Sequence, residues 1–354
     1  MKFIVLENDG IGPEIMAATL PVLEKLDERF GLKIDLVPMV SGMRALKAEG
    51  QTIPQAVYDA CDAADGVILG PVSSFEYPSE AEGGVNPSKS FRKVFDLFAN
   101  IRPARTRPCV PSVIKQMDLV IVRENTEGLY ADRNMFMGSG EFMPTEDVAL
   151  SVRKITRQGC ERIAKQAFEM AMERRKKVTA VHKANVLRMT DGLFLKTVME
   201  VAKGYPSVEV EELIIDAATA HLVKRPQDFD VIVTTNAFGD ILSDLCSELS
   251  GSLGLAGSIN AGKGHVFAQA QHGSAPDIAG KGIANPTALM LSTAMLLEEL
   301  GRRTSRNDLA QASASMFKAV ELALGDPASH TPDLGGKNST EGFGKAVLAA
   351  LDKE

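Results

Sequence analysis

Two carboxylates one helical turn apart are the most informative candidates for chemistry in this sequence. The segment DFDVIVTTNAFGDILSDLCSEL predicts a buried strand, followed from Asn236 by a helix that carries Asp240 and Asp244. A spacing of four residues places both side chains on one helical face, where like charges repel unless a cation lies between them. Carboxylate oxygens suit Mg²⁺ or Mn²⁺, whereas a solvated acidic face is the more frequent meaning of such a pair taken alone.

A third carboxylate and several basic side chains follow other predicted strands. Asp216 ends the string VEVEELIID, at the carboxyl end of a strand, where α/β proteins bind ligands. The guanidinium groups of arginines pair with carboxylates through two parallel hydrogen bonds, and a lysine or tyrosine near a metal can transfer protons. These residues together predict a site for a polycarboxylate, although each alone is more often a surface charge or a core-edge tyrosine. The candidates are Arg102 in ANIRPARTRP, Arg123 and Tyr130 in DLVIVRENTEGLY, and Lys183 in VTAVHKANVL.

Two glycine-rich strings are candidates for a cofactor site. The turn NDGIGPE follows the first strand, but it is not the dinucleotide fingerprint, because Ile15 stands where GxGxxG requires its last glycine. The string at 272–286 is better suited to holding adenosine, with Asp277 accepting hydrogen bonds from both ribose hydroxyls. Its carboxylate would repel the 2′-phosphate of NADP, so we expect NAD. The candidate cofactor-binding residues are His272, Gly273, Ser274, Ala275, Asp277, Ile278 and Asn285.

The elements that must position these residues alternate between apolar strands and amphipathic helices. This alternation predicts an α/β protein with a largely parallel sheet, since parallel strands need helical crossovers. A helix is expected from about Gly12 to Phe30. Strands are expected at residues 2–8, 33–39, 66–70, 118–125, 177–185, 208–216 and 230–236.

Two segments depart from this rhythm. Residues 73–90 predict a mobile binding loop, and residues 131–148 predict a projecting hairpin or arm around a GSG turn. Exposed Met and Phe side chains on an arm are unfavourable in water, so a second subunit is the expected cover. A disordered surface insertion is the alternative interpretation.

Composition narrows the functional classes. The chain has 354 residues, 45% of them hydrophobic, and a formal net charge of -7, which disfavours nucleic acid and anionic membrane surfaces as partners. The amino terminus lacks a signal-peptide core and no run is long enough to span a bilayer, so the cytoplasm is the expected location. The cysteines form no CxxC pair and the histidines no HExxH motif, which disfavours a disulfide framework and a zinc hydrolase.

Taken together, the strings resemble those of the β-decarboxylating dehydrogenases that act on isocitrate, isopropylmalate, homoisocitrate and tartrate or D-malate. Similarity extends over nearly the whole chain in the family's order. The matching motifs are NDGIGPE, FRKVFDLFANIRP, IVRENTEGLY, VHKANVL, TTNAFGDILSD, HGSAPDIAGKGIANPTA and TPDLGG.

The resemblance implies a role for each candidate side chain. Arg92, Arg102 and Arg123 would bind the carboxylates of a 3-substituted malate. Lys183, with Asp216 from the partner subunit, would help to remove the proton of the 2-hydroxyl group, and Tyr130 would protonate the enol left after CO₂ departs. Asp240 and Asp244 would hold Mg²⁺ or Mn²⁺, and Asp216 of the partner subunit would complete the site.

The resemblance also implies the isocitrate/isopropylmalate dehydrogenase fold, which is not a standard Rossmann domain. One domain would comprise residues 1–98 and 253–354 on the cofactor side. The smaller domain would comprise residues 99–252, with the metal and acid/base residues and the arm at about 131–148. Active sites shared between subunits make a homodimer a condition of catalysis.

The resemblance leaves open which malate is the substrate and whether the chain is an enzyme or a regulatory subunit. A non-catalytic regulatory subunit of an isocitrate dehydrogenase is disfavoured, because the acid/base and metal residues are all present. In the loop before Arg92, Ser88 and Lys89 stand where isopropylmalate enzymes have leucines. If a helix begins here, Lys89 shares a face with Arg92, and its buried ammonium would need a counter-charge. We therefore expect isocitrate or homoisocitrate first, then tartrate or D-malate, then 3-isopropylmalate, unless Lys89 extends to solvent.

Overall fold

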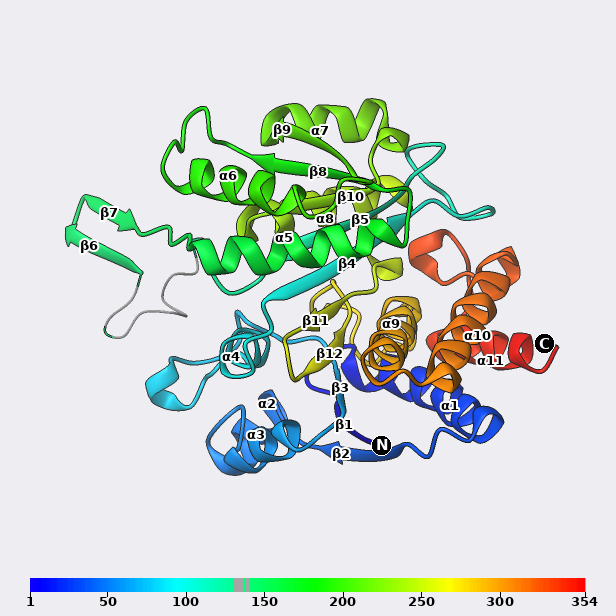
Figure 1. The fold of residues 1–354 in the computed structure, drawn as a ribbon. Coiled ribbons are helices and arrows are strands. Elements are labelled where there is room, and N and C mark those ends of the chain that lie inside the picture. The colour runs from blue at the N-terminus through cyan, green and yellow to red at the C-terminus, as the bar shows by residue number, and fades with distance from the viewer. Residues whose placement is uncertain (130–136, 138–139, 354) are drawn as a thin grey trace.

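A single mixed sheet organises the protein. The computed structural model describes residues 1–129, 137 and 140–353 (Figure 1). In this part of the chain, the large sheet has ten strands in the order β2-β1-β3-β12-β11-β4-β5-β10-β8-β9. Its strands are β1 (Lys2–Leu6), β2 (Asp35–Met39), β3 (Gly66–Leu69), β4 (Ala99–Arg105), β5 (Asp118–Glu124), β8 (Lys177–His182), β9 (Glu209–Ile214), β10 (Val231–Thr234), β11 (Ile259–Ala261) and β12 (Val266–Gln269).

The predicted α/β class and the largely parallel sheet are confirmed. Every strand pairing in the large sheet is parallel except those made by β4 and β11, which lie antiparallel to their neighbours at its centre. The seven expected strands are present, whereas β4, β11 and β12 were not predicted. β4 has Asn100, Arg102 and Pro103 in its interior, and the other two strands have only three or four residues, so none resembles an apolar strand.

Helices cover both faces of the sheet (Figure 1). The first helix spans Gly12–Phe30 as expected and ends at Gly31, whose positive φ suits a left-handed C-cap. The central α9 is buried along most of its length. The helices are α1 (Gly12–Phe30), α2 (Met43–Glu49), α3 (Gln55–Asp62), α4 (Pro87–Val94), α5 (Arg157–Met172), α6 (Thr190–Ala202), α7 (Ile215–Lys224), α8 (Asn236–Ser250), α9 (Thr287–Thr304), α10 (Asn307–Leu324) and α11 (Thr340–Leu351).

Side-chain alternation along β5 determines which helix each residue meets. Val120 and Val122 pack in the core that includes α5, whereas Leu119 and Ile121 pack in the core that includes α8. Successive side chains of a strand point to opposite faces. Arg123 therefore points to the face that α8 covers, although it continues a run of buried apolar residues.

The two halves of the sheet come from different parts of the chain. One half is built from residues 2–69, which form β1, β2 and β3, and from residues 259–269, which form β11 and β12. The other five strands lie within residues 99–234. The chain thus passes between the halves twice. The proposed domain division at residues 98 and 253 stays a prediction.

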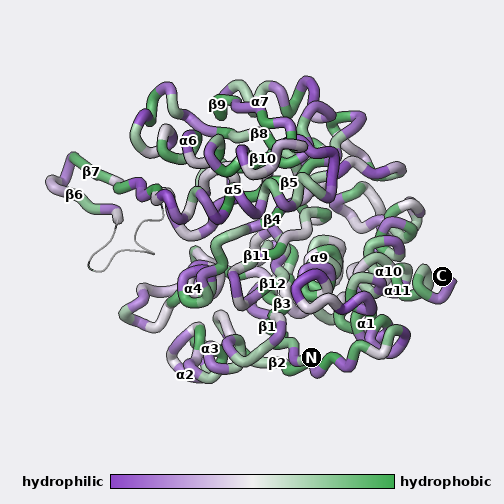
Figure 2. Tube along the Cα trace, viewed as in Figure 1, coloured by the Kyte–Doolittle hydropathy of each residue, from purple (hydrophilic) through white to green (hydrophobic). Residues whose placement is uncertain are grey.

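A hairpin projects from the body of the protein (Figure 1). It consists of β6 (Glu141–Thr145) and β7 (Val148–Ser151), so a projecting hairpin is present, although part of the predicted segment, residues 131–136 and 138–139, lies outside the described residues. Phe142 and Leu150 are about half exposed, at 49% and 48%, and the hairpin has hydrophobic stretches beside hydrophilic ones (Figure 2). None of the helices in the described part of the chain combines the length and apolar character needed to cross a membrane.

Candidate active site

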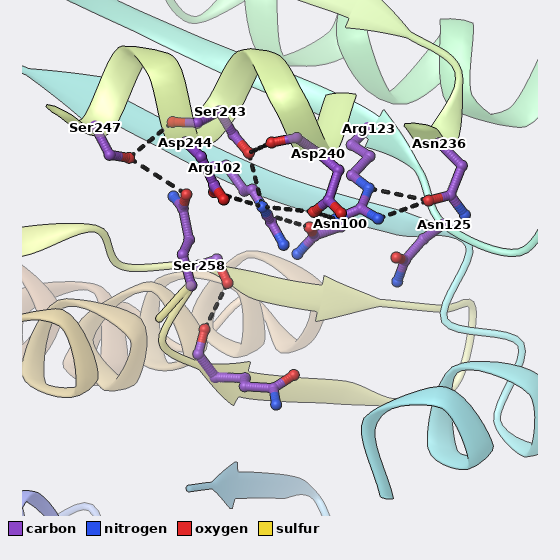
Figure 3. A network of polar contacts seen from close by, with 12 residues as sticks. Asn100, Arg102, Arg123, Asn125, Asn236, Asp240, Ser243, Asp244, Ser247 and Ser258 are labelled. Carbon is purple, nitrogen blue, oxygen red and sulfur yellow. Dashed lines mark hydrogen bonds and ion pairs between the residues drawn. The ribbon is translucent and has the colours of Figure 1, made fainter. Parts of the chain in front are cut away.

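Two buried arginines on adjacent strands form the centre of the candidate site (Figure 3). Arg102 lies on β4 and Arg123 on β5, and their side chains are only 6% and 2% exposed. The helix α8 lies over them. The Nε and Nη2 atoms of Arg123 donate to Oδ1 of Asn236 at 3.1 and 2.7 Å, and Nη1 of Arg102 donates to Oγ of Ser243 at 2.7 Å.

The predicted carboxylate pair faces these arginines. Asp240 forms ion pairs with both guanidinium groups, and Asp244 Oδ1 lies 3.6 Å from Arg102 Nη1. The two side chains are 41% and 56% exposed, so they stand at an open surface above the buried cations. The expected placement of both carboxylates on one helical face is confirmed. Their oxygen atoms and their spacing fit a hard divalent cation.

Burial and neighbouring charges shift the pKa values of side chains in this cluster. Burial raises the pKa of Asp240, but the nearby Arg123, Arg102 and Arg92 outweigh burial and hold this pKa below its ordinary value. Burial and the neighbouring Arg123 lower the pKa of Arg102 to about 10, so it stays cationic at neutral pH. Three arginines thus face the two carboxyl groups of Asp240 and Asp244, and the remaining excess of positive charge favours an anionic ligand.

The α4 helix contributes Arg92 and the residues before it. The predicted helix is present, with Asn86 as N-cap accepting from the Lys89 backbone N–H at 2.9 Å. The expectation that Lys89 is a buried ammonium neutralised by the substrate is not met, because its Nζ lies 3.7 Å from Glu80 Oε1 and its side chain is 37% exposed, as the solvent alternative has it. Ser88 instead meets the sheet, where its Oγ accepts from Gln269 Nε2.

Lys183 and Asp216 form a second pair at the carboxyl ends of β8 and β9. Lys183 Nζ donates to Asp216 Oδ1 at 2.6 Å, and this hydrogen bond is the main cause of the lowered pKa of Asp216. The backbone N–H of Lys183 donates to the buried Asp191 at 2.6 Å, which fixes the turn. Sequence reasoning assigned the Asp216 that assists Lys183 to the partner subunit; in the structure the two side chains meet within one chain.

Lys183 and Asp216 do not follow the strand that carries Arg123. In the order β5-β10-β8-β9, Lys183 follows the second strand from β5 and Asp216 the third, about 10 and 14 Å away at roughly 4.8 Å per strand. Among the described residues, no three His, Cys, Asp or Glu side chains gather closely enough to hold a metal. The assignment of a third carboxylate from a partner subunit stays a prediction. Tyr130 lies outside the described residues.

The two glycine-rich strings meet at the carboxyl ends of β1, β3 and β12. Ile11 N donates to Ser274 O at 2.9 Å, and Ser73 Oγ donates to Ser274 Oγ at 2.8 Å. Gly10 has a φ of +56°, and a Cβ at this position would lie 2.0 Å from Ser274 O. Only glycine allows this close approach without strain. The loop at 272–285 is therefore built against the first turn, which the sequence excluded only as a dinucleotide fingerprint.

The remaining cofactor candidates differ in exposure. Gly273 and Asp277 are exposed and Ala275 and Ile278 half-buried, whereas Asn285 is buried and donates to Asp333 Oδ2 at 3.0 Å. Burial lowers the pKa of His272, so its ring is neutral at neutral pH. These positions form one loop whose exposed residues are accessible to a ligand.

Comparison with known proteins decides the family. The model of the family described as isocitrate/isopropylmalate dehydrogenase matches residues 2–347. The chain belongs to this family. An isocitrate dehydrogenase from Methylococcus capsulatus has a similar structure, with a TM-score of 0.87, 39% sequence identity and coverage of 99% of both chains. The fold is therefore the isocitrate/isopropylmalate dehydrogenase fold, and the chain is an oxidoreductase.

Relatives in this family bear different substrate names. The chain is 43% identical to an isocitrate/homoisocitrate dehydrogenase of Thermus thermophilus over 99% of this chain and 98% of that one. It is 41% identical to a 3-isopropylmalate dehydrogenase of Sulfurisphaera tokodaii over 95% of each chain. Such similar identities do not decide between the substrates.

Sequence reasoning missed several residues that support the site. Asn236 and Ser243 hold the two buried guanidinium groups, and Gln269 meets Ser88. Asn236 and Ser243 lie within the string TTNAFGDILSD, so the sequence alone shows that they are within one helical turn of Asp240. Nothing local indicates which guanidinium group each would meet, because the partners lie more than one hundred residues away.

Proposed function

We propose that this family member catalyses the NAD-linked, Mg²⁺- or Mn²⁺-dependent oxidative decarboxylation of a 3-substituted malate, with isocitrate or homoisocitrate preferred. Tartrate, D-malate and 3-isopropylmalate are the alternatives. The observation that carries this proposal is the convergence of Arg92, Arg102 and Arg123 beside the paired carboxylates of α8. Buried guanidinium groups bind carboxylates strongly, and three of them suit a substrate with several.

The side chains divide the reaction between them. The arginines bind and orient the malate carboxylates. Lys183, together with Asp216, assists removal of the proton of the 2-hydroxyl group, and Tyr130 returns a proton to C3 after CO₂ leaves. Asp240 and Asp244 would hold a divalent cation, which would supply the positive charge that polarises the oxidised hydroxyl group. Bound nicotinamide supplies the hydride acceptor.

A homodimer completes the site in this proposal. In its own chain, Lys183 follows the second strand from Arg123 and Asp216 the third, so a second copy would bring such a pair to the arginines. The exposed apolar side chains of the β6–β7 hairpin suit burial against the same copy.

Charging the hairpin is therefore expected to prevent dimerisation. Phe142→Asp combined with Leu150→Asp should give monomers in sedimentation velocity and lower turnover at least about a hundredfold, because burying two unpaired carboxylates is strongly unfavourable. Leu322→Asp is the control, since it places one such carboxylate on an equally exposed apolar position of α10. A fully active dimer of the hairpin variant would contradict this arrangement.

The choice of cofactor gives a separate prediction. The kcat/KM for NAD should exceed that for NADP by about a hundredfold, because Asp277 would face the 2′-phosphate and close like charges cost several kcal/mol. Asp277→Asn should narrow this ratio by at least about tenfold. A wild-type preference for NADP would refute the assignment.

The proposed reaction is tested by a substrate panel. Purified protein with Mg²⁺ or Mn²⁺ and NAD is assayed against isocitrate, homoisocitrate, 3-isopropylmalate, tartrate and D-malate. We expect NADH formation to be fastest with isocitrate or homoisocitrate. No turnover of any of these acids would refute the proposal and favour a regulatory subunit instead.

A further inference from the structure

Three buried side-chain amides connect the end of β5 to the first turn of α4. Asn125 follows β5, Asn260 lies in β11 and Gln269 ends β12; they are 0%, 2% and 7% exposed. Asn125 Nδ2 donates to Asn260 Oδ1 at 3.0 Å, and Asn260 Nδ2 donates to Gln269 Oε1 at 3.2 Å. Gln269 Nε2 then donates to Ser88 Oγ at 2.5 Å. We call these three residues the amide relay.

A backbone carbonyl sets the direction of every hydrogen bond in the amide relay. Asn125 Nδ2 also donates to the carbonyl oxygen of Leu97 at 2.9 Å. A carbonyl oxygen only accepts, so the NH₂ group of Asn125 must face it. The same NH₂ group faces Asn260, whose oxygen must accept, and the NH₂ group of Asn260 must in turn face Gln269. Each orientation fixes the next one, and the NH₂ group of Gln269 is left pointing at Ser88.

This direction determines what Ser88 can offer a ligand. A hydroxyl group has one hydrogen, and Ser88 Oγ already accepts from Gln269, so the hydrogen is available for donation. No acceptor for it lies among the described residues. Ser88 and Arg92 are four residues apart in α4 and share a face. Arg92 acts on Asp240, so this face is directed towards the arginine cluster.

We propose that Gln269 is a positioning residue that holds Ser88 as a hydrogen-bond donor to an oxygen atom of the substituent at C3 of the substrate. The inference rests on the proposed function for the identity of the bound acid. A carboxylate-bearing substituent accepts the hydrogen, whereas an isopropyl group leaves the hydroxyl without a partner once water is excluded. The amide relay thus selects against an alkyl substituent, and this selection does not depend on Lys89.

Two variants test the direction of the hydrogen bond. Ser88→Ala removes the donor and should lower kcat/KM for isocitrate about tenfold, mainly through KM, whereas kcat/KM for 3-isopropylmalate should rise, because its alkyl group no longer faces an unpaired hydroxyl. Gln269→Glu keeps the shape and the oxygen that accepts from Asn260, but places an acceptor against Ser88. The hydroxyl then donates to residue 269 and turns a lone pair to the substrate, so isocitrate should lose more than about tenfold.

A double-mutant cycle separates positioning from a general effect of the new charge. If Gln269 acts through Ser88, Gln269→Glu should add less than about threefold in the Ser88→Ala background. Additive losses, or equal losses for both acids, would overturn the inference. Gln269→Met, which removes the donor without adding charge, serves if the Glu variant does not fold, and its loss must also disappear in the Ser88→Ala background.

Ser90→Ala is the matched control for the serine change. Ser90 lies on the same helix, but its hydroxyl is 2.6 Å from the Tyr58 hydroxyl, so the ratio between the two acids should not change. Calorimetric titration with isocitrate keeps this test distinct from the proposed catalysis. If no malate is oxidised, selective loss of isocitrate binding in Ser88→Ala still supports the inference, and equal binding by wild type and variant overturns it.

Discussion

Replacing Asp244 by Asn is expected to lower kcat/KM by about a thousandfold, the effect of losing about 4 kcal/mol of transition-state stabilisation by a bound cation. A neutral amide is a poor ligand for Mg²⁺ or Mn²⁺. Asp244 is the better target of the pair, because Asp240 forms ion pairs with both buried arginines and its loss would also leave these cations uncompensated. Excess EDTA should abolish wild-type turnover to a similar extent.

A measurement of binding distinguishes loss of the metal from general damage. Saturating Mn²⁺ should raise the melting temperature of wild type by on the order of 5 °C and leave that of Asp244→Asn unchanged. Glu248→Gln is the control, since it removes the same charge one turn further along α8 and should keep both turnover and the thermal shift. Full activity of the wild type in EDTA would exclude the metal from the mechanism.

Replacing Lys183 by Met is expected to lower kcat by about a thousandfold, because positioned proton transfer contributes about 10²–10⁴. The change also releases Asp216 from its hydrogen bond at 2.6 Å. A more decisive test combines one chain carrying Lys183→Met and one chain carrying Asp244→Asn in the same dimer. In a shared site, the metal carboxylates of one subunit act with the Lys183–Asp216 pair of the other.

Co-expression with two affinity tags isolates the mixed dimer. One of its two sites then combines an intact Lys183 with an intact Asp244, and the other site carries both changes. We expect about half of wild-type activity from a dimer of two nearly inactive chains, as two-fold symmetry requires. Independent sites in each chain would leave the mixed dimer as inactive as either parent, and that result would refute the shared site. Lys203→Met, which changes an exposed lysine at the end of α6, is the control and should leave kcat unaffected.

The sequence by itself determined the local elements and the residues whose side chains could take part in catalysis or binding. The first helix was predicted from Gly12 to Phe30, as observed, because its apolar spacing and the glycine after it are local signals. The common face of Asp240 and Asp244 follows from helix geometry over a single turn. The family was recognisable from separated motifs, each of which can be read without knowledge of the others.

Only the tertiary structure decided which side chains meet. Arg102 and Ser243 are 141 residues apart, and Gln269 and Ser88 are 181 residues apart. Their contacts depend on β4 lying antiparallel to β5 and on β12 lying beside β3, which no local pattern specified. Likewise, Glu80 as the counter-charge of Lys89 was not recognised, since an ion pair to a side chain in a single 3-10 turn, Glu80–Glu82, has no periodicity. Periodicity reports the face of one element, whereas a contact between elements depends on how the whole sheet assembles.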